Sequence, residues 1–139
     1  MDYYIYHQEH ANELNALPKL YPIEMAINNN DVVVNQSDPS NSERFFEFLS
    51  NIEKGIPDKI RITRYGIDNP EMALRTILEY NGTYYIFTIA GDTTSPKSYY
   101  GNELTLKRTT PDSPWQYLLN TYEGTEVLVF TLYNFHKTN

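Results

Sequence analysis

The clearest pattern of hydrophobic and polar positions in this chain predicts a helix followed by a strand within residues 40–65. Apolar side chains recur there at intervals of three and four residues, which places them on one stripe of a helix: Phe45, Phe48, Leu49 and Ile52. Ser40 and Glu43 have the spacing of a capping box, while Gly55 and Pro57 can end the helix. We therefore expect an amphipathic helix that packs its apolar stripe against a sheet.

Short β-prone segments occupy much of the remaining chain. Directly after the helix, Ile60 and Ile62 alternate with Arg61 and Thr63, which is the period of a strand with one buried face. On this pattern we expect strands at residues 31–35, 59–67, 72–80, 83–90, 103–109 and 126–133. A short helix is expected after Pro22, because proline suits the first turn of a helix.

The Asn81-Gly82 dipeptide predicts a hairpin between two of these strands. A type I′ turn needs positive φ at both central residues, which asparagine and glycine tolerate best. We therefore expect positive φ at Gly82 and a two-residue turn that pairs Tyr80 with Thr83.

Two other segments are interpreted from their composition. Residues 91–102 are polar and are expected to form a loop that contains Tyr99 and Tyr100. Residues 115–122 fit either a helix or the first strand of a hairpin that turns at Glu123-Gly124, and we favour the hairpin.

Together these elements predict an α+β fold. We expect an antiparallel sheet of about five to six strands packed against one main amphipathic helix, with a short N-terminal helix. Residues 1–20 have weak periodicity and are expected to form an N-terminal arm, and residues 21–139 a single domain.

Composition and charge exclude several classes of protein. The net charge is −7, which argues against binding to nucleic acid or to an anionic membrane surface. The chain has no cysteine, so we expect neither disulfides nor thiolate metal sites. No apolar run is long enough for a transmembrane helix, and the first residues do not resemble a signal peptide. The protein either stays inside the cell or begins after a removed leader.

Several segments resemble a domain-of-unknown-function family of small proteins from Bacillus-like Gram-positive bacteria, many of them predicted exported lipoproteins. The segments are residues 21–35, 45–55, 58–69, 78–82 and 127–134. Members often carry a cysteine pair in the C-terminal half, and this chain has none. The resemblance implies a compact α+β domain and an extracellular or cell-envelope location, the alternative being the cytoplasm.

No catalytic, metal or cofactor motif is present. His7 and His10 flank Glu9, but no third ligand lies nearby in the sequence, so we predict no metal site and expect both histidines to be solvated. Four carboxylates lie beside predicted turns and are the candidates for a hydrolase with a carboxylate pair: Asp31, Asp68, Glu71 and Asp92. Turn and capping roles explain all four residues more simply.

Binding is therefore the function that we favour, with the small hydrolase as the alternative. The chain has 13 tyrosines, and tyrosine offers contact area and a hydroxyl at low entropic cost. We expect a protein, peptide or glycan to bind through residues of the outer sheet face and of the polar loop: Arg61, Arg64, Arg75, Tyr84, Tyr99 and Tyr100.

Overall fold

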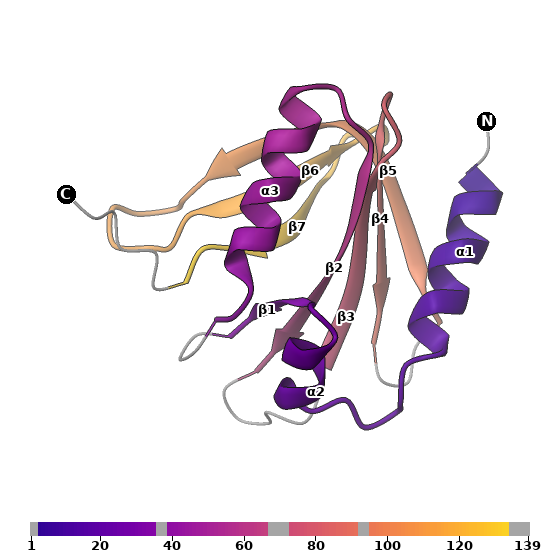
Figure 1. Ribbon diagram of the computed structural model, residues 1–139. Helices are drawn as coiled ribbons and strands as arrows, with labels where there is room; N and C mark the ends of the chain where they lie inside the picture. The colour runs from indigo at the N-terminus through magenta and orange to yellow at the C-terminus, as the bar shows by residue number, and fades with distance from the viewer. Residues whose placement is uncertain (1–2, 36–38, 67–72, 92–94, 134–139) are drawn as a thin grey trace.

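The computed structural model describes residues 3–35, 39–66, 73–91 and 95–133. Within them lie three helices: α1 (Tyr3–Asn15), α2 (Ile23–Asn28) and α3 (Ser42–Glu53). Seven strands form one sheet in chain order: β1 (Val32–Val34), β2 (Asp58–Tyr65), β3 (Ala73–Tyr80), β4 (Tyr85–Ala90), β5 (Lys97–Lys107), β6 (Gln116–Thr121) and β7 (Glu126–Thr131). Figure 1 shows how the helices stand around this sheet.

The sheet is mixed, which corrects the expected antiparallel sheet of five to six strands. β1 pairs parallel to β2, with Val33 opposite Thr63, while the other neighbouring strands are antiparallel. Parallel neighbours need a crossover connection, and α3 supplies it between β1 and β2. The direction of β1 therefore follows from the helix that carries the chain back before β2 begins.

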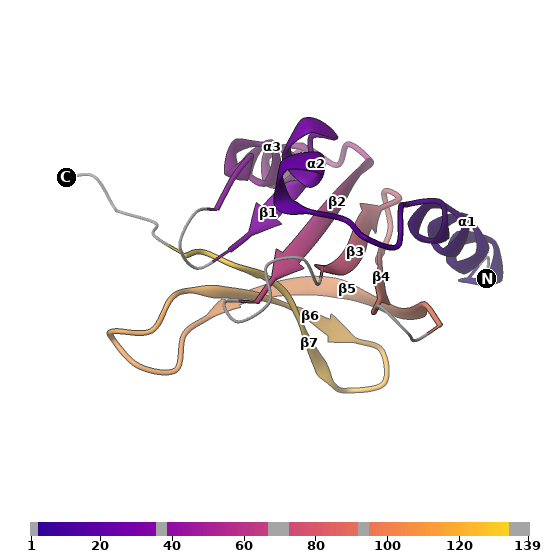
Figure 2. The ribbon, with the colours of Figure 1, turned by 90° about the horizontal axis from the view of Figure 1, so that it is seen from below.

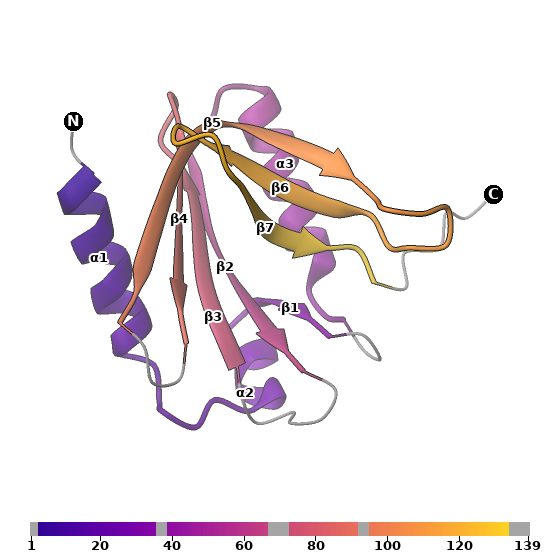
Figure 3. The same ribbon diagram turned by 180° about the vertical axis from the view of Figure 1, so that it is seen from behind.

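The sheet also curls into a half-barrel. Figure 2 and Figure 3 show β5, β6 and β7 bending away from the plane of the first strands. Irregular register interrupts the ladders between Gly101 and Glu103 and between Tyr117 and Leu118, and such bulges bend a strand and increase its twist. The expected layer of one main helix on an antiparallel sheet is therefore wrong, because the sheet curves around α3 and two further helices pack outside it.

The main core fills the concave side of the half-barrel. Phe45 and Phe48 of α3 are fully buried, and the other members of the predicted apolar stripe pack against the same cluster. The ring of Phe45 stacks on that of Phe130 in β7, with centroids 4.1 Å apart. Side chains of β2, such as Ile62, belong to this cluster as well. Helix α3 therefore joins the early and late strands of the sheet.

The C-terminal end of α3 agrees with the prediction, and the N-terminal end does not. Gly55 has a φ of 75°, as expected for a left-handed residue that ends a helix. At the start, the N-cap is Asn41, whose side chain makes no capping hydrogen bond. The capping box of Ser40 and Glu43 is not formed, because the backbone of Ser40 instead exchanges hydrogen bonds with Val33 of β1.

Helices α1 and α2 cover the convex side of the sheet. Leu14 of α1 packs against Ile77 of β3, and α2 lies over Val33 and Tyr65. Helix α2 confirms the short helix predicted after Pro22. Residues 3–15 of the expected arm form a docked helix in which His10 is fully buried, so the expectation that His10 is solvated is wrong.

The β3–β4 hairpin has a four-residue loop, 81–84, in place of the expected two-residue turn. Tyr80 pairs with Tyr85, two residues further along than predicted. The cause is the side chain of Asn81, whose Oδ1 accepts hydrogen bonds from two backbone N–H groups of the loop. Gly82 has a φ of 100°, which confirms the predicted positive φ. A shift of two residues keeps every side chain on its predicted face.

The later strands agree with the sequence in part. Residues 97–102, expected in a polar loop, form the first half of β5, and residues 92–94 of that loop lie outside the described residues. The hairpin predicted for residues 115–133 is confirmed by β6 and β7. Among the helices of the described segments, none is long and apolar enough to cross a membrane.

Candidate functional site

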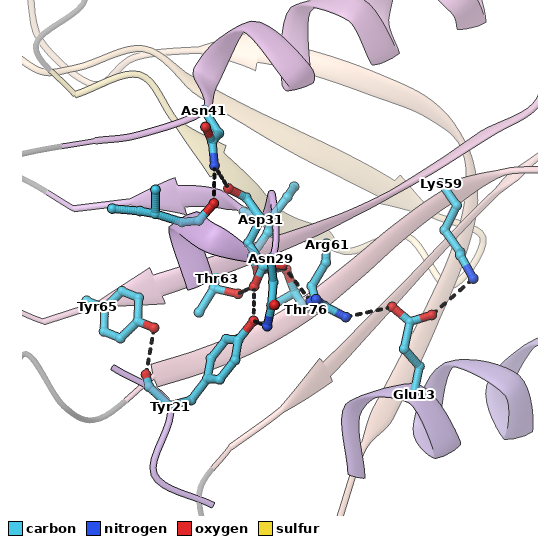
Figure 4. A network of polar contacts seen from close by, with 12 residues as sticks. Glu13, Tyr21, Asn29, Asp31, Asn41, Lys59, Arg61, Thr63, Tyr65 and Thr76 are labelled. Atoms are coloured by element: carbon cyan, nitrogen blue, oxygen red, sulfur yellow. Dashed lines mark hydrogen bonds and ion pairs between the residues drawn. The ribbon is translucent and has the colours of Figure 1, made fainter. Parts of the chain in front are cut away.

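The candidate site is built around Asp31, which directly precedes β1 and is only 1% exposed. Its Oδ2 accepts hydrogen bonds of 2.7 Å from the hydroxyls of Tyr21 and Thr63. Its Oδ1 accepts a 2.7 Å hydrogen bond from Nε of Arg61. A carboxylate is costly to bury without such donors. Asp31 is therefore the centre of a well-satisfied polar network (Figure 4).

Three chain segments position this network. Strand β2 carries Arg61 on its convex side, toward Asp31. The turn after α2 supplies Asn29, whose Nδ2 donates to the hydroxyl of Tyr21 over 3.1 Å. Asn41, at the start of α3, donates to the backbone oxygen of Asp31 over 2.9 Å. These contacts fasten the α2–β1 turn to β2, and the start of α3 to the α2–β1 turn.

The protonation of the network follows from its burial and its partners. Burial raises the pKa of the Asp31 carboxyl, and hydrogen bonds from Tyr21, Thr63 and Arg61 oppose this rise. Burial also raises the pKa of the Tyr21 hydroxyl, which therefore stays a donor at neutral pH. Burial lowers the pKa of the Arg61 guanidinium, but Asp31, Tyr21 and Glu13 together outweigh this effect and leave that pKa raised. Arg61 therefore keeps its charge.

A second carboxylate reaches Arg61 from α1. Oε2 of Glu13 lies 3.0 Å from Nη1 of Arg61, and Oε1 lies 3.0 Å from Nζ of Lys59. The side chain of Glu13 is 31% exposed, whereas that of Arg61 is 17% exposed. One helix side chain therefore joins two basic residues of β2 at the edge of solvent, as Figure 4 shows.

An open pocket of about 210 Å³ lies over these groups. Its lining residues are polar apart from one isoleucine: Glu13, Asn29, Asn30, Asp31, Arg44, Lys59, Ile60 and Arg61. Three of them are basic and two are acidic, and the third cation, Arg44, is paired with Asp58 and Glu47 just outside the lining. Its lining matches a small polar or anionic group rather than an apolar one.

Arg44 of α3 forms a fixed wall of this pocket. Its two terminal nitrogens donate to the two carboxylate oxygens of Asp58 over 2.9 and 2.6 Å, which is the strong bidentate arrangement. Asn51 donates to the same carboxylate over 3.0 Å. Burial raises the pKa of Asp58, but the hydrogen bonds from Arg44, Asn51 and the Lys59 backbone leave that pKa below its usual value. The pair holds α3 against β2.

The Asp31→Asn variant is expected to lower the free energy of unfolding by about 1–3 kcal/mol, because buried donors lose a charged acceptor. The amide NH₂ would face the donors of Tyr21, Thr63 or Arg61. Urea denaturation followed by circular dichroism measures the effect. The control is Asp112→Asn, an exposed aspartate of the β5–β6 connection, which should change stability by less than about 0.5 kcal/mol. Equal effects of the two substitutions would contradict a structural role for the network.

The structure separates the three arginines that we expect on one outer face. Arg61 lines the pocket. Arg75 lies on the same face, but its Nη2 donates to the backbone oxygen of Lys19 and its guanidinium lies over the ring of Tyr21. Arg64 faces the concave side, because it is an odd number of positions from Arg61 along β2. The three arginines therefore do not share one surface.

Two of the predicted tyrosines, Tyr99 and Tyr100, lie in β5 and face different sides of the sheet, and Tyr84 lies in the β3–β4 loop. Tyr99 packs against the concave core, and Lys97 lies over its ring. Tyr100 is on the convex side, where its ring stacks on Tyr3 of α1 with centroids 3.9 Å apart. Tyr84 meets Tyr3 edge-on at 5.5 Å. Tyr99 and Tyr100 are therefore not brought together, and Tyr84 and Tyr100 hold α1 on the sheet.

A chain of hydrogen bonds beneath α1 has no counterpart in the sequence prediction. Nδ1 of His7 lies 2.6 Å from the hydroxyl of Ser98, which lies 2.8 Å from that of Thr88. His10 connects Thr88, at 2.8 Å, with Glu79, at 2.7 Å. Both His10 and Thr88 are fully buried, so the centre of this chain docks α1 on the sheet, whereas His7, Ser98 and Glu79 are only partly buried. Its members come from four elements, which is why sequence spacing does not reveal it.

Comparisons with known proteins add no identity to this site. No family model matches the chain, and neither a curated protein nor a solved structure matches it. Within the described segments, no group of three or more histidine, cysteine, aspartate or glutamate side chains could hold a metal ion. The function of the pocket is therefore argued from its own chemistry.

Proposed function

We propose that this protein is a non-enzymatic binding domain, and that its pocket over Arg61 binds the anionic group of a polar ligand. The ligand would be part of a peptide, a protein or a glycan. One observation carries the proposal: buried Asp31 holds Arg61 in place beneath an open polar pocket, next to the ammonium of Lys59. A side chain that is fixed in advance loses little conformational entropy when a ligand binds.

The charged groups of the pocket support an anionic ligand. Lys59 and Arg61 share a single counter-ion in Glu13, and Arg61 has a second one in Asp31. A guanidinium matches the oxygens of a carboxylate or a phosphate, and an ammonium adds a mobile point charge. The amide side chains of Asn29 and Asn30 in the lining add donors and acceptors for the rest of a polar ligand.

The alternative of a small hydrolase is less well supported by the same pocket. Glu13 and Asp31 both line it, as a pair of catalytic carboxylates would. Arg61, however, forms ion pairs with both, at 3.0 and 2.7 Å. Asp31 is also only 1% exposed and its carboxylate oxygens are bonded to Tyr21, Thr63 and Arg61, so it is poorly placed to reach a substrate. The other three candidates, Asp68, Glu71 and Asp92, lie outside the described residues.

A location at the cell envelope is part of this proposal, with the cytoplasm as the alternative. It rests on the resemblance to exported lipoproteins described above and on no feature of the pocket. Fractionation of the native host followed by immunoblotting would decide between the two compartments.

A ligand screen tests the proposed binding function. The panel holds inorganic phosphate, N-acetylglycine, an acidic peptide and an acidic oligosaccharide, each titrated at constant ionic strength while thermal unfolding is followed. A ligand that binds only the folded state raises its stability by about 2.7 kcal/mol at about a hundredfold excess over Kd. We expect at least one anionic member to give a saturable rise in the melting temperature. We expect Lys59→Met to weaken that response, because Lys59 lines the pocket.

Lys107→Met is the matched control for this screen. Lys107 is 52% exposed and pairs with Glu126 on the β5–β7 side of the sheet, away from the pocket. It should bind the panel as the wild type does. A panel without any saturable response, or equal binding by the wild type and Lys59→Met, would contradict the proposed function.

A further inference from the structure

The carboxylate of Glu13 occupies the position that an anionic ligand would need. Each of its oxygens meets a different cation, with Oε1 3.0 Å from Nζ of Lys59 and Oε2 3.0 Å from Nη1 of Arg61. The two cations therefore hold one planar, two-oxygen group between them. Glu13 reaches them from α1, 46 and 48 residues away in the chain.

We infer that Glu13 is an internal occupant of the anionic subsite, and that the ligand of this pocket carries a carboxylate which takes its place. The inference rests on the proposed function of the pocket, and it names the ligand group and a means of regulation. In the absence of ligand, Glu13 neutralises Lys59 and Arg61. A ligand carboxylate then competes with Glu13 for the same two cations.

The ion pair with Asp31 holds Arg61 in position whether or not Glu13 is bound to it. Its Nε is bound to Asp31, which is 1% exposed, so the guanidinium plane is held while Nη1 points to Glu13. When the side chain of Glu13 moves away, Arg61 stays in position. The position left behind then presents Nη1 and the ammonium of Lys59 toward the pocket, and one incoming carboxylate can satisfy both.

Glu13 can leave without loss of helix α1. Its side chain is 31% exposed and that of Lys59 is 45% exposed, and ion pairs so open to water are individually weak. Helix α1 is held by other contacts: His10 and Leu14 are buried against the sheet, and Tyr3 stacks on Tyr100. Rotation of one glutamate side chain therefore opens the subsite while the fold stays intact.

The Glu13→Gln variant tests this inference. Kd is measured for N-acetylglycine, glucuronate and inorganic phosphate from the backbone amide shifts of Asn29, Asn30 and Lys59, at constant ionic strength. Removing the competing charge should tighten carboxylate binding by about twofold to thirtyfold, as expected for the loss of one exposed and one partly buried ion pair. The gain should disappear in Glu13→Gln combined with Lys59→Met. A gain for N-acetylglycine indicates a peptide carboxylate, and one for glucuronate indicates an acidic sugar.

Glu9→Gln is the matched control, since Glu9 is an exposed glutamate of α1 that does not line the pocket. It removes the same charge and should leave Kd unchanged. Equal Kd values for the wild type and Glu13→Gln would overturn the inference, while binding in the pocket would leave the proposed function standing. If Glu13→Gln gains more affinity for phosphate than for either carboxylate probe, the inference that the ligand carries a carboxylate is overturned. If Glu13→Gln binds no probe, the inference fails, and the peptide and oligosaccharide arms of the screen then decide the proposed function.

Discussion

The Phe45→Ala variant is expected to have a free energy of unfolding about 3–5 kcal/mol below that of the wild type. Phe45 is fully buried, stacks on Phe130 of β7 and meets Tyr117 of β6 edge-on. The substitution therefore removes a ring from the place where α3 joins the late strands of the half-barrel. Urea denaturation followed by circular dichroism at two or more wavelengths measures the loss.

Phe46→Ala is the matched control for this prediction. Phe46 is the next residue of α3, and it is 38% exposed. Its replacement should lower the free energy of unfolding by less than about 1 kcal/mol, because little buried volume is lost. Similar losses of stability for the two variants would contradict the burial of Phe45 between α3 and the curled sheet.

The Gly101→Ala variant is expected to lose about 3 kcal/mol of stability or more, which is the upper range for adding a methyl group to a packed site. A Cβ at Gly101 of β5 would overlap the backbone carbonyl oxygen of Asn120 in β6. Backbone atoms cannot yield as a flexible side chain can, so the β5–β6 ladder has to separate. The position lies at the bulge where the sheet begins to curl.

Gly66→Ala provides the comparison within the same chain. A Cβ at Gly66 meets no atom within 4 Å, and Gly66 does not have positive φ. Its substitution should leave the midpoint of urea unfolding within experimental error of the wild type. If Gly101→Ala unfolds at the same midpoint as Gly66→Ala, the close approach of β5 and β6 is contradicted.

Local features of the fold could be predicted, because their causes lie within a few residues of each other. The stripe of α3 and the positive φ of Gly55 and Gly82 depend on periodicity and on the chirality of the backbone. The register of the β3–β4 hairpin could not be read in the same way, because the side chain of Asn81 closes a longer loop. Ser40 pairs with β1 rather than capping α3, which is a tertiary contact.

The candidate site was only partly visible in the sequence, because it depends on how distant segments converge. The sequence indicates Asp31 only as an isolated carboxylate and Arg61 only as a member of an arginine face. Because 30 residues separate them, the sequence does not show that they form an ion pair. Glu13 is not identifiable as a site residue from the sequence, since the periodicity of α1 is weak. The docking of α1, seen in the burial of His10, depends on contacts with β3 and β4. A buried polar network of this kind is recognised only when the strands that carry its members are in place.

Mapping of ligand binding by NMR tests the central claim most directly, namely that the pocket over Arg61 is the binding site. Backbone amide shifts of the wild type are followed during titration with each member of the ligand panel at constant ionic strength. We expect the largest saturable shifts at Asn29, Asn30 and Lys59, and unchanged shifts at Tyr99 and Tyr100. Shifts that cluster instead at Tyr99 and Tyr100, or an absence of saturable shifts at the pocket, would contradict it.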